Sequence, residues 1–499
     1  MDSLVIISWI EHLYILLVLI VVITVLTSGK KAGSVMAWIF AIMFLPIVGI
    51  ILYIALGVNW RKRRLLRSKF ENSPNKVLSK MSSDMSKREI SKYDTKDTFN
   101  TSPLKLDNVD DLTKEIDEYG GREISKLLYT TGGTYLTKNS SYDFYFDGGE
   151  AFDSIISDLE NAKESIYMEY FIWKSDVLGE KIKDILLRKA KEGLDIKLIF
   201  DGLGSFGRIS LKYRKSLEAA GIEFRYFLDV KYKLLKLNYR NHRKMVIVDS
   251  KILHTGGMNL GQEYIDGGKA FDSWRDTNSR IEGELVLHYL AVFISDWMSS
   301  NGKFNFILPK EIPVSDGDYL MQVSASGPDT IWSSLQMLYT KLITEATEEI
   351  LIESPYFVPD DGILEQLQIA ALAGISVKII IAGKPDKKIP FWVAETYFED
   401  LLNSGIEVYR YQKGFLHCKN IIVDEKISTM GTCNFDFRSF ELNYEINTVY
   451  YNQEMSKKLK EQFFEDLKYC TKITSEELDK KNLFFRLRDS IFRVLSPIL

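Results

Sequence analysis

Two segments far apart in the chain repeat one arrangement of residues that can do phosphoryl chemistry. Each holds a histidine, a lysine two positions later and an aspartate five positions after the lysine: His242, Lys244 and Asp249 in the first, His417, Lys419 and Asp424 in the second. Residues at i and i+2 of a strand point to one face, so each segment presents an imidazole beside an ammonium. The aspartate has an odd offset, and we therefore expect Asp249 and Asp424 to be structural members of the motif.

A Gly-x-x-Asn sequence follows each motif and ends at Asn259 or Asn434. If the two segments face each other, two histidines, two lysines and two asparagines surround one centre. That set suits a phosphodiester, because lysine and asparagine offset charge on the phosphoryl oxygens. One histidine attacks the phosphorus and the other protonates the leaving alcohol.

A nucleophilic histidine needs an acceptor that fixes its tautomer. Two candidate acids follow the motifs: Asp276, 34 positions after His242, and Glu445, 28 positions after His417. An ordinary surface or salt-bridged acid is the alternative for each. Metal binding is not expected, because clustered His/Cys ligands are lacking outside the motifs and lysine is a poor ligand.

The sequence around the motifs is also duplicated. In both copies a helical pattern leads to a short apolar strand ending near Glu169 or Glu353, and further helices and strands alternate after it. Such alternation predicts an α/β fold with a largely parallel sheet. We expect two homologous halves, at 143–300 and 317–470, that form one pseudo-symmetric catalytic unit.

Two apolar segments open the chain, Leu4–Leu26 and Val35–Val58, and each is long enough to cross the ~30 Å of a bilayer core. Residues 1–60 are therefore predicted to be an anchor with two transmembrane helices. The basic cluster at 61–69 favours a cytoplasmic catalytic part. Residues 61–142 are expected to form a basic and polar linker.

The C-terminal tail, residues 471–499, mixes basic residues with apolar ones at 484, 487, 491 and 495. This spacing predicts an amphipathic helix. Such a helix lies on an anionic lipid surface or packs on the catalytic core, and the sequence leaves both open. The basic stretch at 231–236 is likewise predicted to border the path of a lipid.

Composition excludes several classes of protein. Aromatic residues make up 12% of the 499 residues, which disordered chains do not reach. Three cysteines rule out a disulfide framework. The net charge of −4 argues against a dedicated nucleic-acid binder.

The duplicated motif with its Gly-x-x-Asn resembles the phospholipase D superfamily. The front segment, with Ala37-Trp38 and Leu45–Tyr53, and the tail at Arg493–Leu499 resemble those of bacterial cardiolipin synthases. One departure is visible: the family often has serine after the first glycine, where this chain has Gly257 and Thr432.

The resemblance implies transfer of a phosphatidyl group between two phosphatidylglycerol molecules at the cell membrane, with release of glycerol. It implies His242 as the nucleophile and His417 as the general acid, anionic lipids as partners and no cofactor. The alternatives are a phospholipase D-type hydrolase, a superfamily nuclease and an inactive membrane scaffold. The oligomeric state is left open.

Overall fold

The computed structural model describes residues 3–28, 32–57, 74–86, 115–228 and 238–495. The basic stretches at 61–69 and 231–236 lie outside the described residues, so the predictions made for them are not addressed by the structure.

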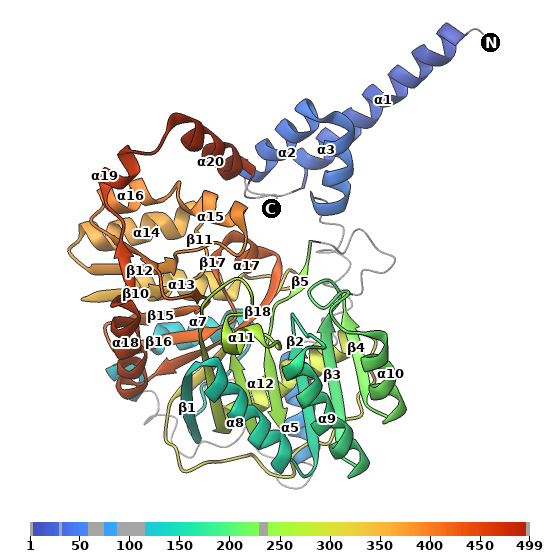
Figure 1. Ribbon diagram of the computed structural model, residues 1–499, viewed down its shortest axis with the longest axis vertical. Helices are drawn as coiled ribbons and strands as arrows, with labels where there is room; N and C mark the ends of the chain where they lie inside the picture. Colours follow the sequence, from blue (N-terminus) through green and yellow to red (C-terminus); the bar gives the residue numbers. More distant parts are fainter. Residues whose placement is uncertain (1–2, 29–31, 58–73, 87–114, 229–237, 496–499) are drawn as a thin grey trace.

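The first half is built on a mixed sheet in the order β1-β8-β7-β6-β2-β3-β4 (Figure 1). Its strands are β1 (Ser140–Asp147), β2 (Ser165–Tyr170), β3 (Asp195–Asp201), β4 (Glu223–Phe227), β6 (Met245–Val248), β7 (Ile252–Gly256) and β8 (Trp274–Gly283). Helices α8 (Gly148–Asn161), α9 (Val177–Lys191) and α10 (Leu211–Ala219) connect the early strands, and α11 (Glu263–Asp266) precedes β8.

The second half repeats this order strand for strand, from β9 through β18, β16, β15, β10 and β12 to β13. Its strands are β9 (Met321–Ser326), β10 (Glu349–Glu353), β12 (Ser376–Ala382), β13 (Glu407–Tyr411), β15 (Asn420–Val423), β16 (Ile427–Gly431), β18 (Asn443–Tyr451) and the added edge strand β19 (Cys470–Lys472). Its helices are α13 (Ser334–Glu345), α14 (Asp361–Leu372), α15 (Lys388–Ala394), α16 (Phe398–Asn403) and α17 (Phe437–Glu441). The α/β fold and the duplication are confirmed.

The prediction of a largely parallel sheet was wrong. Among the strands that each half contributes to its own main sheet, parallel pairing is confined to β2, β3 and β4, and to their counterparts β10, β12 and β13. The motif strand β6 pairs antiparallel with both β2 and β7, and β7 pairs antiparallel with β8. The physical reason is the connection: helical crossovers lead to parallel pairing, whereas the short turn between β6 and β7 makes a hairpin, and β8 returns antiparallel after the longer segment that holds α11.

A shared apolar core joins the halves. Helices α12 (Leu285–Ser299) and α18 (Gln453–Leu467) lie within it, with side chains such as Leu290 and Leu459 fully buried beside residues of both sheets. Helix α5 (Pro74–Ser86) packs on α12, and α7 (Arg122–Gly132) adds Ile124 and Leu128 to the core of the second half. These two helices, predicted as linker, are part of the folded body.

Two short strands cross between the halves. Strand β5 (Arg240–Asn241) pairs in parallel with β18 of the second half, and β14 (Phe415–Leu416) pairs in parallel with β8 of the first. A further pair, β11 (Phe357–Val358) with β17 (Phe435–Asp436), lies within the second half. Because β5 and β14 each come directly before a motif, the exchange brings each motif against the other half.

The apolar front segments form helix α1 (Ser3–Leu26) and a folded unit of α2 (Ala32–Phe44), α3 (Pro46–Leu52) and the π-helix η1 (Tyr53–Gly57). The second predicted span is therefore not one continuous helix. Pro46 restricts the residue before it, and Leu45 takes φ −130° and ψ 66°, which breaks the helix. Gly49 then lets α3 fold back on α2, since a Cβ there would lie 2.4 Å from the Ala41 carbonyl oxygen.

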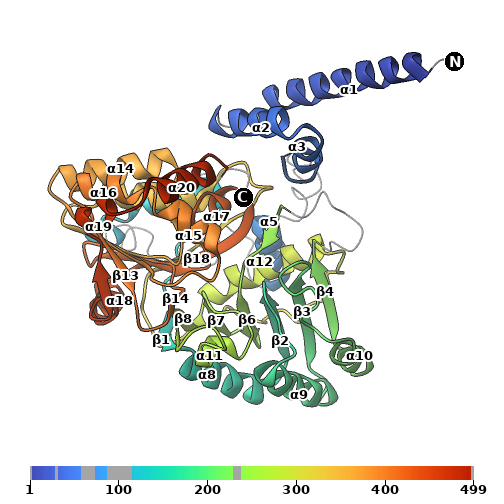
Figure 2. The same ribbon diagram turned by 45° about the horizontal axis from the view of Figure 1, so that its top comes forward.

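Among the residues that the structure describes, none of the helices combines the length and the apolar character needed to cross a bilayer. The C-terminal tail forms α19 (Ser475–Asp479) and the predicted amphipathic helix α20 (Leu483–Leu495). Both views place α20 at the same end of the molecule as α1, α2 and α3 (Figure 2).

Candidate active site

The two motif histidines are fixed to the opposite half by their main chains. The His242 amide donates to the Tyr444 carbonyl at 2.9 Å, and the His417 amide donates to the Arg275 carbonyl at 2.7 Å. Each histidine stands in the extended residues between a crossing strand and its motif strand, because β6 and β15 begin one residue after the lysine. The pseudo-symmetric face-to-face arrangement predicted from the motifs is present in the fold.

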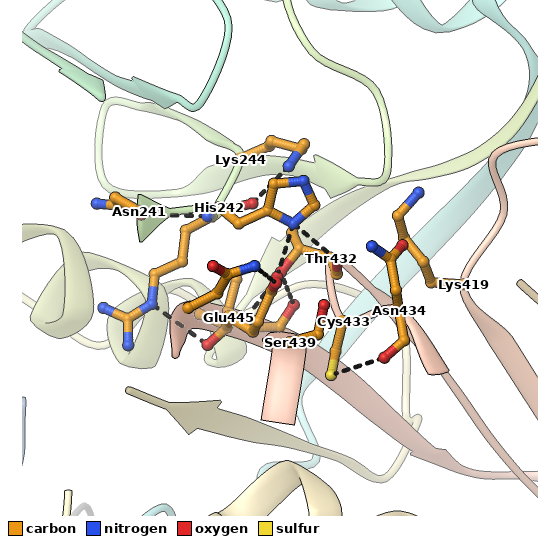
Figure 3. Close-up of polar contacts among 12 residues, drawn as sticks. Asn241, His242, Lys244, Lys419, Thr432, Cys433, Asn434, Ser439 and Glu445 are labelled. Carbon is orange, nitrogen blue, oxygen red and sulfur yellow. Dashed lines mark hydrogen bonds and ion pairs between the residues drawn. The ribbon is translucent and has the colours of Figure 1, made fainter. Parts of the chain in front are cut away.

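Each histidine is paired with the carboxylate of the other half. His242 Nδ1 lies 3.0 Å from Glu445 Oε2, and His417 Nδ1 lies 2.6 Å from Asp276 Oδ2 (Figure 3 shows the first pair). Both acids are completely buried. From the sequence, each acid was expected beside the histidine of its own motif, whereas in the structure each contacts the histidine of the other half. With a proton on Nδ1 donated to the carboxylate, the lone pair is left on Nε2, which is then free to act as a nucleophile or base.

Burial keeps both imidazoles neutral. It lowers the pKa of His242 to about 4 and that of His417 to about 3, although the carboxylate partners oppose the shift. The ammonium groups of Lys244 and Lys419 lower the pKa of both histidines further, which places all four groups in one electrostatic cluster. A neutral His is the form that attacks phosphorus.

The paired carboxylates stay ionised. Burial by itself raises their pKa values, but the net pKa of Asp276 is lowered by Lys419 and His417, and that of Glu445 by His242 and Lys244. An ionised acceptor stabilises an imidazolium as it forms, so each pair can take up and release a proton at Nε2.

The two motif lysines are buried and do not line the cavity, and each contacts the main chain of its own histidine. Lys244 donates to the carbonyl of His242, and Lys419 donates to the carbonyl of His417. Burial lowers the pKa of Lys244 to about 7, and it also lowers the pKa of Lys419. Their positive charge is held in a low-dielectric place, where it acts strongly on an anion between the histidines.

Asp249 and Asp424 lie in turns away from the histidines. Asp249 accepts hydrogen bonds from the amides of three successive residues, Lys163, Glu164 and Ser165. Asp424 does the same for Thr347, Glu348 and Glu349. Both have a φ of 52°, in the left-handed region that aspartate tolerates. This is the structural role expected from their odd offset.

The two asparagines, one from each half, both line the cavity. Asn259 is already engaged, since its Oδ1 accepts from the Ile172 amide at 3.0 Å and its Nδ2 donates to the Tyr264 hydroxyl at 2.8 Å. Asn434 is 6% exposed, and its Oδ1 has no hydrogen-bond partner among the described residues. Asn259 and Asn434 thus hold equivalent places in the two motifs but differ in their hydrogen bonds.

Close packing explains why residue 257 is a glycine. A Cβ there would lie 2.1 Å from Asp276 Oδ1, so the carboxylate fills the space that a side chain would need. On the other side the Thr432 hydroxyl accepts from the Ile446 amide at 2.9 Å and helps to lower the pKa of Glu445. In the first half, the space that a serine side chain would take at position 257 is therefore filled by the Asp276 carboxylate.

Two buried arginines support the carboxylates, and sequence reasoning missed both. Arg243 pairs with Asp296 of α12 and donates to the Glu445 carbonyl at 3.3 Å. Arg275 pairs with Asp466 of α18 at 2.7 Å and donates to the Asp276 carbonyl. Their signal in the sequence was adjacency to a candidate site residue: Arg243 lies between His242 and Lys244, and Arg275 directly precedes Asp276.

A cavity of about 1150 Å³ opens above the two histidines. Apolar side chains from both halves form much of its wall: Phe171, Leu203, Phe271, Trp274, Val358, Ile389, Pro390 and Val393. Basic side chains also line it, including Arg208, Arg240, Lys269 and Arg438. A space of this size and mixed character suits a molecule with an anionic head and an apolar body.

Comparisons with known proteins show the family to which the chain belongs. A family model described as "Cardiolipin synthase, PLD-like domain" matches residues 155–297 and 339–467, and one described as phospholipase D-nuclease N-terminal matches residues 15–57. The chain is 39% identical over 472 residues to a cardiolipin synthase of Clostridium perfringens, covering 93% of this chain and 94% of that protein. It is 36% identical over 491 residues to the major cardiolipin synthase ClsA of Bacillus subtilis, covering 97% and 98%.

Among solved structures, the fold is similar to that of a phosphatidylserine synthase from Haemophilus influenzae. The TM-score is 0.58 at 16% sequence identity, over 78% of this chain and 100% of that one. This likeness concerns the fold alone. The family match and the full-length relatives carry the assignment: the chain belongs to the cardiolipin synthase family of phospholipase D-like proteins.

Proposed function

We propose that this protein is a cardiolipin synthase, which transfers a phosphatidyl group from one phosphatidylglycerol to another and releases glycerol. The observation that carries the proposal is the pair of neutral histidines, each held at Nδ1 by a buried carboxylate of the opposite half, at the floor of one cavity. The family of the chain supplies the substrate class.

In the first step, Nε2 of His242 attacks the phosphorus of one phosphatidylglycerol. The bond from phosphorus to the glycerol oxygen breaks, and His417 gives that oxygen a proton. The anionic phosphodiester, bound between the histidines, favours the protonated form of His417 needed here. The product of this step is a phosphatidyl group on His242 and free glycerol.

In the second step, a hydroxyl of another phosphatidylglycerol gives its proton to His417 and attacks the same phosphorus. The bond from phosphorus to His242 breaks, and cardiolipin leaves. One phosphodiester replaces another, so the exchange needs no energy source. The buried charges of Lys244 and Lys419 stabilise the negative oxygens of both transition states.

We also propose that helices α1, α2 and α3 hold the chain at the cell membrane, with both halves on the cytoplasmic side. Exposed apolar side chains such as Ile23, Phe44 and Ile51 support this attachment. In this arrangement the chain crosses the bilayer twice, as expected from the sequence. The turn after α1 then lies on the outer side of the membrane. A cysteine introduced at Ser28 then reacts in whole cells with a maleimide that does not cross membranes. Protection of that cysteine, with labelling only after lysis, favours a shallow attachment without crossings.

The activity is tested with purified protein and phosphatidylglycerol as the only lipid. We expect cardiolipin and glycerol in equal amounts. Phosphatidic acid as the main product would favour the hydrolase, and no conversion would favour the inactive scaffold. His254→Gln is the matched control for both motif histidines. It lies outside the cavity, where His254 Nε2 pairs with Asp158 at 2.7 Å, and this variant keeps activity.

A further inference from the structure

Helix α20 presents an apolar face to solvent. Leu483, Phe484, Leu487 and Ile491 are between 52% and 79% exposed, although they follow the spacing of one helical face. Arg486 is also exposed beside them. In a soluble chain such a face normally packs on a neighbour. In this chain the apolar face of α20 packs on none of the described elements, so we look for its partner outside the protein.

The opposite face of α20 is joined to α15 and the residues after it. The Arg488 guanidinium lies 4.1 Å from the centre of the Trp392 ring, and Phe492 lies 5.4 Å from the same ring. Arg493 donates to the Thr396 carbonyl at 3.2 Å. Trp392 is thus held by two residues of α20, which makes the contact specific.

Helix α15 is also a wall of the catalytic cavity. Its Ile389, Pro390 and Val393 line the cavity, and Trp392 is the neighbour of Val393. The inner side of α15 packs on β11, with Val393 and Ala394 buried in the core of the second half, while α20 holds its outer side through Trp392. The position of α20 therefore bears on the cavity wall from its outer side.

The position of α20 indicates what covers its apolar face. It contacts α2 and lies at the end of the molecule where α1, α2 and α3 present their exposed apolar side chains (Figures 1 and 2). A basic amphipathic helix binds anionic bilayer surfaces through apolar insertion and charge attraction. Both features point to a lipid surface rather than to a second protein.

We propose that α20 lies on the anionic surface of the bilayer and, through Trp392, holds α15 in the position that shapes the cavity, so that anionic lipid activates the enzyme. The lipid contact is independent of the chemistry, whereas the activation rests on the proposed function. Each arginine near an anionic surface contributes roughly fivefold to binding, so the contact depends strongly on lipid charge.

The contact is tested with a bimane probe on a cysteine replacing Phe484 in the full-length protein, with Cys470→Ser as background. The control probe replaces Val314, which is 69% exposed in the loop between α12 and β9. In phosphatidylcholine vesicles that contain phosphatidylserine, we expect brominated acyl chains to quench the probe at 484 but not at 314. Equal, weak quenching at both positions overturns the lipid contact, whatever the enzyme makes.

The coupling is tested by cardiolipin formation at constant phosphatidylglycerol while phosphatidylserine replaces phosphatidylcholine. We expect several-fold activation of the wild type and of Val314→Glu, and none of the Phe484→Glu/Leu487→Glu variant. Trp392→Ala should keep quenching at 484 and lose the activation, and Trp392→Phe should restore part of it. Activation that persists in both the double variant and Trp392→Ala overturns the coupling. Absence of cardiolipin in the wild type contradicts the proposed function instead and leaves the quenching result valid.

Discussion

Glu445 Oε2 lies 3.0 Å from Nδ1 of His242, although the first residue belongs to the second half of the chain and the other to the first half. Asp276 and His417 form the reciprocal pair at 2.6 Å. Neither half therefore holds a complete histidine–carboxylate pair. The chemistry depends on docking of the halves, which the crossing strands β5 and β14 fix in register.

The exchanged carboxylates should matter for rate more than for stability. Glu445→Gln and Asp276→Asn keep the shape but remove the acceptor charge that orients and stabilises the imidazolium. We expect each to lower kcat by about 10²- to 10⁴-fold, as in other histidine–carboxylate pairs. The rate of cardiolipin formation measures this, with thermal unfolding as the control. Wild-type rates in either variant would show that its pair is dispensable.

The motif aspartates should matter for stability more than for rate. Asp249→Ala leaves three backbone amides without their acceptor, and Asp424→Ala does the same. Each loss is expected to cost about 1–3 kcal/mol of unfolding free energy. Chemical denaturation measures that cost, and the rate per folded molecule is expected to change little. A large fall in kcat at unchanged stability would place these aspartates in the reaction.

The dependence of kcat/KM on pH should be a bell. His242 must be neutral to attack, and its pKa is lowered to about 4, so activity rises as the pH rises through that value. Lys244 must be charged, and its pKa is lowered to about 7, so activity falls as the pH rises through that value. His417 must carry a proton to serve the leaving oxygen, and its pKa in the free enzyme is lowered to about 3, so kcat/KM also declines above that value. The bell is therefore skewed to the acid side, and the decline becomes steeper where Lys244 loses its charge.

Lys244→Arg gives the matched test of the alkaline limb. A guanidinium stays charged throughout this range, so the alkaline limb should move to higher pH while the acid limb stays. A short-chain phosphatidylglycerol in detergent keeps the substrate accessible across the range. An alkaline limb that does not move in this variant would assign it to a different group.

Loss of the buried Arg275–Asp466 pair should lower both the free energy of unfolding and the rate of cardiolipin formation. Asp466→Ala leaves the Arg275 guanidinium buried without its carboxylate, at a cost of about 3–5 kcal/mol. Because Arg275 also donates to the Asp276 carbonyl, the remaining folded enzyme should be slower as well. Asp466→Asn retains a hydrogen-bond acceptor, so it should lose less unfolding free energy and less of the rate than Asp466→Ala. The two variants are compared by denaturant unfolding and by rate, and equal losses would argue against the role of the charge.

The motif residues could be predicted from the sequence, because each motif is a set of residue types a few positions apart in one segment. The two motifs, Asn259 and Asn434 and the structural place of Asp249 and Asp424 all rest on one strand or one turn. The break at Pro46 was also accessible to local rules, since a residue before proline disfavours the helix.

What the sequence could not predict depends on contacts between distant segments. Nothing near His242 indicates that its acid is Glu445, because that pairing arises from the docking of β5 on β18. The same holds for Arg243 with Asp296, and for the cavity wall supplied by Pro390. The mixed sheet was missed because alternation of strands and helices does not reveal which strands return by hairpins.

The central claim is a covalent phosphatidyl group on His242, and its direct measurement is mass spectrometry of the enzyme quenched in base during turnover. The account predicts an adduct on the peptide that contains His242 in the wild type and its loss in His242→Ala. An adduct on His417 instead, or one that persists in His242→Ala, would contradict it.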